Sequence, residues 1–289
     1  MKIERLILSG CGPSGFVYVG ILQALFDKKI LDKELTGIQE IITTSIGILP
    51  SFLLLLKIDN KLIYEIVKKY YMESILNLED ISIDNLLVDF GLLSNEKIQN
   101  IFQTFTKHIL QKQDINLQEL YDISHIKLSV KVFNHTLKIY EYISYITDPD
   151  LSISKLAQMT TCIPFLFIPI KYKDNLYLDG GIQDSFPIDN SHENYLGLLI
   201  YGGMTSMNTM IEEYFPLLKF MKNIHMNLHE ISLKAKSTEI DNIIYYDINL
   251  GLNFSLSEKE KEIYIQKAYD TTINHIHTYQ LTNDILQKS

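Results

Sequence analysis

The first third of the chain alternates between apolar runs and helix-like stretches in the manner of strand–loop–helix units. The apolar run from Arg5 to Leu8 predicts a strand, and a glycine-rich loop and a helix from about Pro13 to Lys28 follow it. A second apolar run, Ile38 to Thr43, predicts another strand, and Ile46 to Lys57 predicts a second, buried helix. Two such units in succession predict an α/β protein with a parallel sheet.

The middle of the chain has a different pattern. From Lys61 to about Gln113, apolar residues recur at three-to-four spacing, which predicts helices. The alternating stretch from Lys127 to Ser144 predicts a pair of strands. Further strands are expected at 176–179, 195–200 and 243–246, and further helices at about 154–161, 205–236 and 257–279. Since no linker or repeat interrupts the chain, we predict one domain over residues 1–289: a three-layer α/β/α sandwich with a mostly parallel central sheet and a helical insertion at about 58–125.

The composition of the chain argues against some classes of binding partner and indicates a cellular compartment. The chain has 289 residues and a net charge of −9, which argues against a nucleic-acid-binding protein and against electrostatic adsorption to anionic lipid. Cys11 and Cys162 are its two cysteines, too few for a disulfide framework, so we expect a reducing compartment. The N-terminus lacks the pattern of a signal peptide, and the most apolar stretch, Ile48 to Ile58, is too short to span a bilayer. These features predict a cytoplasmic protein.

The glycine loop LILSGCGPSGF permits two kinds of ligand. Gly10, Gly12 and Gly15 satisfy the G-x-G-x-x-G spacing of dinucleotide-binding loops, but the same backbone N–H groups suit the oxyanion of an acyl-transfer intermediate. A dinucleotide site also needs an acidic residue at the end of the second strand, where this chain has Thr43 and Thr44. The sequence therefore favours the oxyanion, and we predict no cofactor.

A serine stands where the second strand meets its helix, in the stretch EIITTSIGIL. Ser45, with Gly47 two residues later, matches most of the G-x-S-x-G nucleophile elbow, in which a sharp turn presents the hydroxyl at the mouth of the sheet. Thr43 replaces the first glycine of that pattern. The ordinary alternative is that these hydroxyl residues cap the helix.

An aspartate occupies a comparable position later in the chain, in LYLDGG. Asp179 ends a short predicted strand, and Gly180 and Gly181 follow it. The dipeptide Asp179-Gly180 is also a common turn signal. A nucleophilic serine needs a base within hydrogen-bond reach in space and not in sequence, so Asp179 is a candidate base for Ser45.

Three motifs, SGCGPSGF, TTSIG and LDGGIQDSFP, occur in an order that resembles the patatin-like phospholipases. The flanking stretches VYVGILQAL and QMTTCIPFLFIPI are similar as well. This resemblance implies a Ser–Asp dyad on an α/β/α sandwich that hydrolyses acyl esters of phospholipids or related lipids, with transient contact at membrane surfaces. It assigns Ser45 as nucleophile, Asp179 as base, and the loop of Gly10, Cys11 and Gly12 as the oxyanion hole.

The chain departs from the family pattern at three positions. Thr43 replaces a glycine, Cys11 replaces the middle glycine of the loop, and Ser14 replaces a basic residue. These departures leave a second hypothesis open, namely a catalytically weak or inactive lipid-binding protein on the same fold.

Two further stretches carry weaker hypotheses. The segment Pro164 to Ile170 either lines an acyl pocket or belongs to the core. His225 and His229 are four residues apart, but Met226 follows the first histidine, so the H-E-x-x-H zinc motif is absent and we predict no metal site.

Overall fold

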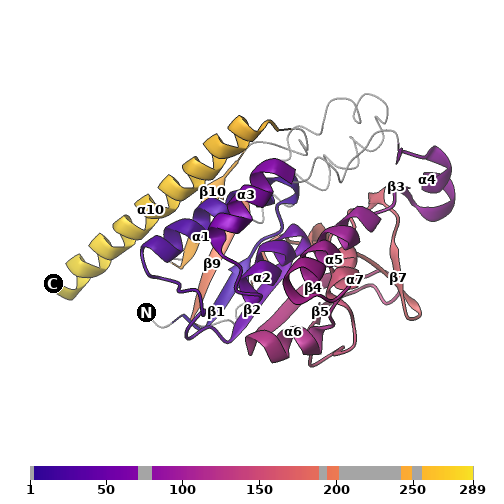
Figure 1. Ribbon diagram of the computed structural model, residues 1–289, viewed down its shortest axis with the longest axis horizontal. Coiled ribbons are helices and arrows are strands. Elements are labelled where there is room, and N and C mark those ends of the chain that lie inside the picture. Colours follow the sequence, from indigo (N-terminus) through magenta and orange to yellow (C-terminus); the bar gives the residue numbers. More distant parts are fainter. Residues whose placement is uncertain (1–2, 71–79, 189–193, 202–241, 249–255, 289) are drawn as a thin grey trace.

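The computed structural model describes residues 3–70, 80–188, 194–201, 242–248 and 256–288 (Figure 1). The strands of its main sheet are β1 (Arg5–Leu8), β2 (Glu40–Thr44), β4 (Lys127–Asn134), β5 (Ile139–Ile143), β7 (Ile170–Tyr172), β8 (Asn175–Asp179), β9 (Tyr195–Tyr201) and β10 (Ile243–Asp247). They follow the order β10-β9-β1-β2-β4-β8-β7, and β5 pairs with β4 beside this path. The strands from β10 to β4 run parallel, whereas β5, β7 and β8 are antiparallel to their neighbours. The predicted mixed α/β fold with a mostly parallel central sheet is therefore confirmed.

The described helices are α1 (Tyr18–Asp27), α2 (Ile48–Leu55), α3 (Asn60–Tyr70), α4 (Ile83–Asp89), α5 (Glu96–Leu110), α6 (Leu117–Ser124), α7 (Ile153–Thr160) and α10 (Glu258–Lys288). One face of the sheet buries a large apolar core together with α1, α2, α7 and α10. All eight residues of α2 are buried, as its apolar sequence predicts. The opposite face carries a second, smaller apolar cluster that includes Ile7, Ile42, Phe186 and Leu199.

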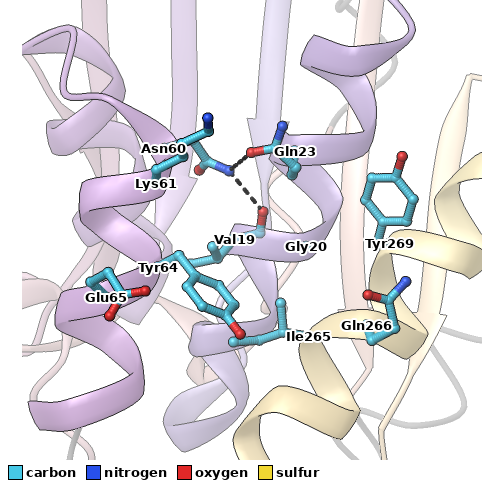
Figure 2. A pocket seen from close by; sticks show the side chains of 10 residues that line it. All are labelled: Val19, Gly20, Gln23, Asn60, Lys61, Tyr64, Glu65, Ile265, Gln266 and Tyr269. Atoms are coloured by element: carbon cyan, nitrogen blue, oxygen red, sulfur yellow. Dashed lines mark hydrogen bonds between the residues drawn. The ribbon is translucent and has the colours of Figure 1, made fainter.

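Helix α10, the last helix of the chain, lies alongside α1 (Figure 1). Gly20 of α1 makes this close approach possible, because a Cβ atom at this position would lie 2.1 Å from the carbonyl oxygen of Ile265. A hollow of about 290 Å³ lies beside this contact, between α1, α3 and α10 (Figure 2). Its lining residues include none of the predicted site residues.

Short elements differ from the sequence prediction. The helix expected from Pro13 begins as a 3₁₀ turn, Gly12–Val17, and α1 starts only at Tyr18. The expected helical stretch after Lys61 contains β3 (Gly91–Leu93), which pairs in parallel with β6 (Phe165–Phe167) in a separate two-stranded sheet. Three-residue strands carry too few positions for a period to be visible, and distant pairing stabilises them. The helix expected at 205–236 lies outside the described residues.

Candidate active site

The register of β4 brings two strand ends together. Strand β2 pairs with the first part of β4, ending with Thr44 opposite Lys131, and β8 pairs with the next residues, with Asp179 opposite Val132. Strand β5 pairs with β4 from Val130 onward, overlapping both contacts. Since a strand has two edges and β5 occupies one of them, β2 and β8 share the other edge, and their carboxyl ends meet there. Ser45 follows the end of β2 directly, so topology alone places it beside Asp179.

The two candidate side chains form a short hydrogen bond. Ser45 Oγ donates to Asp179 Oδ2 at 2.6 Å, although the residues are 134 positions apart in sequence. The Gly181 N–H donates to the other carboxylate oxygen at 2.7 Å, which fixes the orientation of the carboxylate. Ser45 is 7% exposed and Asp179 is 5% exposed. Burial raises the pKa of Asp179 to about 6, while the hydrogen bonds from Ser45 and Gly181 and the charge of Lys131 oppose this rise.

The backbone of Ser45 is strained in the manner of a nucleophile elbow. Its φ is +50°, in the left-handed region that a residue with a Cβ rarely adopts. Its N–H donates to Thr160 Oγ1 at 2.8 Å, and this hydroxyl in turn donates to the Lys131 carbonyl at 2.8 Å. Because the Ser45 hydroxyl binds a carboxylate and not a backbone N–H of the following helix, the helix-capping alternative does not describe it.

Two glycines allow the segments around the pair to approach closely. A Cβ at Gly10 would lie 2.7 Å from Ser45 Cβ, so the first residue of the glycine loop lies directly against the elbow. A Cβ at Gly180 would lie 2.2 Å from the carbonyl oxygen of Lys131. The residue after Asp179 must therefore be glycine for the turn to pass this close to β4.

The glycine loop presents two backbone N–H groups. The Gly10 N–H donates to the Ser185 carbonyl at 2.7 Å, whereas within the described part of the chain no acceptor lies against the N–H of Cys11 or Gly12. The conformation explains why a cysteine is tolerated here: Cys11 has φ −150°, and the left-handed value of +53° falls on Gly12. A cysteine in place of the glycine therefore causes no backbone strain at position 11.

Of the other two departures from the family pattern, the surrounding structure accommodates the one at Thr43. Thr43 Oγ1 donates to the Leu8 carbonyl at 3.1 Å, and a Cβ at Gly47 would lie 2.3 Å from this hydroxyl. The elbow thus accepts a threonine at position 43 because position 47 is glycine. Ser14 is fully buried, and its hydroxyl has no hydrogen-bond partner among the described residues.

Sequence reasoning missed Thr160 and Lys131. The polar residue of an alternating strand is expected to face solvent, yet Lys131 is 5% exposed. Thr160 lies at the end of α7, and its sequence gives no sign that it accepts a bond from the elbow. The contacts of both residues depend on strand register, which local sequence does not specify.

The remaining candidates are the segment Pro164 to Ile170 and the two histidines His225 and His229. In the segment Pro164 to Ile170, Leu166 and Phe167 are buried in the core and Phe165 is 39% exposed. His225 and His229 lie outside the described residues, and within the described ones no three His, Cys, Asp or Glu residues gather as metal ligands do. Of the helices that the structure describes, none is both long enough and apolar enough to cross a bilayer.

The fold is thus an α/β fold with a mostly parallel sheet. Its serine and carboxylate meet at strand ends, and ligands of α/β proteins commonly bind at strand ends. A family model of patatin-like phospholipases matches residues 6–191, and the chain belongs to this family. A probable lipid hydrolase of Invertebrate iridescent virus 6 (463L) is 30% identical over 64% of this chain and 62% of its own length. An uncharacterised protein of Acanthamoeba polyphaga mimivirus (R571) is 25% identical over 90% and 89% of the two chains. The crystal structure of VipD from Legionella pneumophila superposes with a TM-score of 0.59 at 18% identity, covering 96% of this chain and 67% of its own.

Proposed function

We propose that the protein hydrolyses carboxylic ester bonds of phospholipids or related acyl lipids, with Ser45 as nucleophile and Asp179 as base. The observation that carries this proposal is the 2.6 Å hydrogen bond from Ser45 Oγ to Asp179 Oδ2 at a strained elbow. Membership of the patatin-like family supports the substrate class, as does the match to a viral protein described as a probable lipid hydrolase.

The first half of the reaction transfers the acyl group to the protein. Ser45 Oγ attacks the ester carbonyl carbon while its proton passes to Asp179 Oδ2. The negative charge that develops on the carbonyl oxygen is stabilised by the N–H groups of Cys11 and Gly12, each such donor being worth about 10²–10³ in turnover. The intermediate collapses as the carbon–oxygen bond to the leaving alcohol breaks and Asp179 returns the proton to that alcohol. An acyl-Ser45 ester remains.

The second half restores the free serine. A water molecule gives a proton to Asp179 and attacks the acyl carbon, and the same two N–H groups stabilise the new oxyanion. When the bond to Ser45 Oγ breaks, the proton passes from Asp179 to the serine, and the fatty acid leaves. A base in this role works best when its pKa lies close to the working pH, and a carboxyl pKa of about 6 suits it better than the ordinary value of 3.8.

The test is hydrolysis of acyl esters by matched variants. Ser45→Ala and Asp179→Asn are each expected to reduce release of fatty acid from mixed phospholipid vesicles to background, because one removes the nucleophile and the other the base. Ser94→Ala and Asp148→Asn serve as controls, since Ser94 is exposed and the Asp148 carboxylate pairs with Lys173 and not with Ser45. Appreciable hydrolysis by either site variant would overturn the assignment. Vesicle binding without hydrolysis by the wild type would favour the lipid-binding alternative.

We also propose that the protein touches the membrane surface transiently, because its substrates reside there. Exposed apolar side chains around the β3–β6 sheet support this proposal. Leu87 and Val88 of α4 are 73% and 72% exposed, and Phe90 and Phe165 are 63% and 39% exposed. Phe165 lies opposite Gly91 in the β3–β6 pairing, so both phenylalanines belong to one end of the molecule, where α4 projects (Figure 1).

A further inference from the structure

Lys131 is a lysine buried in the middle of the central sheet. It lies in β4 opposite Thr44 of β2 and is 5% exposed. Lys127, four residues earlier in the same strand, keeps a third of its side chain exposed and pairs with Glu40 at 2.8 Å. An ammonium group is expensive to bury unless its surroundings compensate the lost hydration. Lys131 directly precedes Val132, which pairs with Asp179 in the sheet. A buried lysine at this position therefore calls for a functional explanation.

The backbone of Lys131 connects the elbow to the turn that follows Asp179. Its carbonyl oxygen accepts hydrogen bonds from Thr44 Oγ1 at 3.2 Å and from Thr160 Oγ1 at 2.8 Å. Thr160 Oγ1 also accepts the Ser45 N–H, and Gly180 packs directly against the same Lys131 carbonyl. One peptide group thus contacts the supports of both candidate catalytic side chains.

The side chain of Lys131 contacts the far end of the same turn. Its Nζ donates to the Asp184 carbonyl oxygen at 3.4 Å and lies 4.9 Å from the centre of the Tyr140 ring. Lys131 therefore contacts both ends of the turn from Gly180 to Asp184: Gly180 packs against its carbonyl, and the Asp184 carbonyl accepts a hydrogen bond from its ammonium group.

We propose that Lys131 is a positioning residue that keeps Asp179 ionised and in place as the base of the reaction. This inference rests on the proposed function, because it assigns Asp179 the role of base. Lys131 acts through Asp179 and through the turn behind it, without contact with substrate.

The charged and titratable groups around Asp179 are consistent with this role. Tyr140 of β5 and Cys162 after α7 both have pKa values raised chiefly by burial and partly by the charge of Asp179, so both are neutral at physiological pH. The Asp184 carboxylate, in the following turn, accepts the Phe186 N–H at 3.0 Å. The positive charge that opposes the effect of burial on the pKa of Asp179 comes from Lys131.

The test is the pH dependence of hydrolysis of a soluble fluorogenic acyl ester by Lys131 variants. Lys131→Met removes the charge, and Lys131→Gln removes it but keeps a donor toward the Asp184 carbonyl. Both variants are expected to raise the midpoint of the acid limb in the pH profile of kcat/KM by about one pH unit. The reason is that a nearby opposite charge lowers a carboxyl pKa by roughly 1–3 units, and both variants remove this charge. Lys131→Arg keeps the charge and should retain the wild-type midpoint, as should the matched control Lys127→Met. Coincident midpoints for wild type, Lys131→Met and Lys131→Gln would overturn the proposal.

A second measurement follows the protonation of the Asp179 carboxylate directly and does not depend on an activity assay. In protein labelled with ¹³C at the aspartate carboxyl groups, Asp179→Asn identifies the Asp179 resonance, and its titration is followed in wild type and in Lys131→Gln. A higher midpoint in the variant supports the role of Lys131, and an unchanged midpoint refutes it. Failure of the proposed function would look different, as wild type and Ser45→Ala would then be equally inactive whatever the carboxyl titration shows.

Discussion

At the scale of single residues, the site consists of groups held in unfavourable states that suit a reaction. Ser45 occupies a left-handed backbone conformation, and Asp179 is a carboxylate removed from water. Such states persist only where the surrounding structure determines them strongly, here through Thr160, Gly181 and the close approach of Gly10. We therefore expect stability and activity to oppose one another at these positions.

Asp179→Asn should stabilise the protein at high pH. The pKa of Asp179 is raised from 3.8 to about 6 on folding, so the folded state binds this proton more tightly than the unfolded state. The cost of the buried charge is absent below pH 4 and complete above pH 6. With about 1.4 kcal/mol for each pKa unit, it is on the order of 3 kcal/mol at pH 8. Asparagine avoids this cost and still accepts the Gly181 N–H.

Thermal melting at pH 8 and at pH 4.5 checks this expectation. The midpoint of Asp179→Asn should exceed that of the wild type at pH 8, and the difference should shrink strongly at pH 4.5. Asp148→Asn is the control, since this carboxylate pairs with Lys173 near the surface. A difference that is equal at both pH values would mean that burial of the Asp179 charge costs little.

At the scale of elements, the β3–β6 sheet and α4 form an apolar end that is joined by a short connection to the site. Phe165 begins β6 three residues after Cys162, whose carbonyl accepts the Asp179 N–H at 2.9 Å. Three extended residues span at most about 11 Å, so only a short stretch of chain separates Phe165 from the strand end that carries Asp179. Contact of this end with a bilayer would bring the site near the acyl lipids that we propose as its substrates.

Leu87→Ser combined with Val88→Ser should weaken binding to phosphatidylcholine vesicles at least tenfold. Each apolar side chain that enters lipid contributes roughly 1.5–3 kcal/mol, and this contribution is lost in the double variant. Zwitterionic vesicles are chosen because Asp84 and Asp89 of α4 lie beside these residues and would repel anionic lipid. Ile146→Ser, at a residue that is 65% exposed elsewhere, is the matched control. Equal flotation of the double variant and the control with vesicles would refute the contact surface.

At the scale of the whole molecule, the two ends of the chain share one sheet. β1 lies between β2 and β9, and β9 pairs with β10, so strands on both sides of residue 191, where the family match ends, are hydrogen-bonded to one another. α10 packs on α1 in the same layer. These contacts support our proposal that residues 1–289 form a single domain. The segment 58–125, proposed as a helical insertion, also contains the strand β3.

The parts of this fold that could be predicted are those with a local signal. β1 and β2 are apolar runs that end at glycine or hydroxyl residues, and Ser45 follows the carboxyl end of a parallel strand, where active residues of parallel sheets gather. Asp179 also ends a strand that the sequence predicts, but this strand, β8, is antiparallel to β4. The parts that could not be predicted depend on pairing between distant segments. β3 and β6 form because they meet each other, and the burial of Lys131 follows from the register of three strands around it.

The central claim is that Ser45 is a nucleophile activated by Asp179, and covalent labelling tests it most directly. A fluorophosphonate probe is incubated with wild type, Ser45→Ala and Asp179→Asn, and the modified peptide is identified by mass spectrometry. We predict a single adduct on Ser45 in the wild type, none in Ser45→Ala, and labelling slowed at least a hundredfold in Asp179→Asn, because general-base catalysis contributes about 10²–10⁴. A folded wild type that takes up no probe, or an adduct on another residue, would contradict the account.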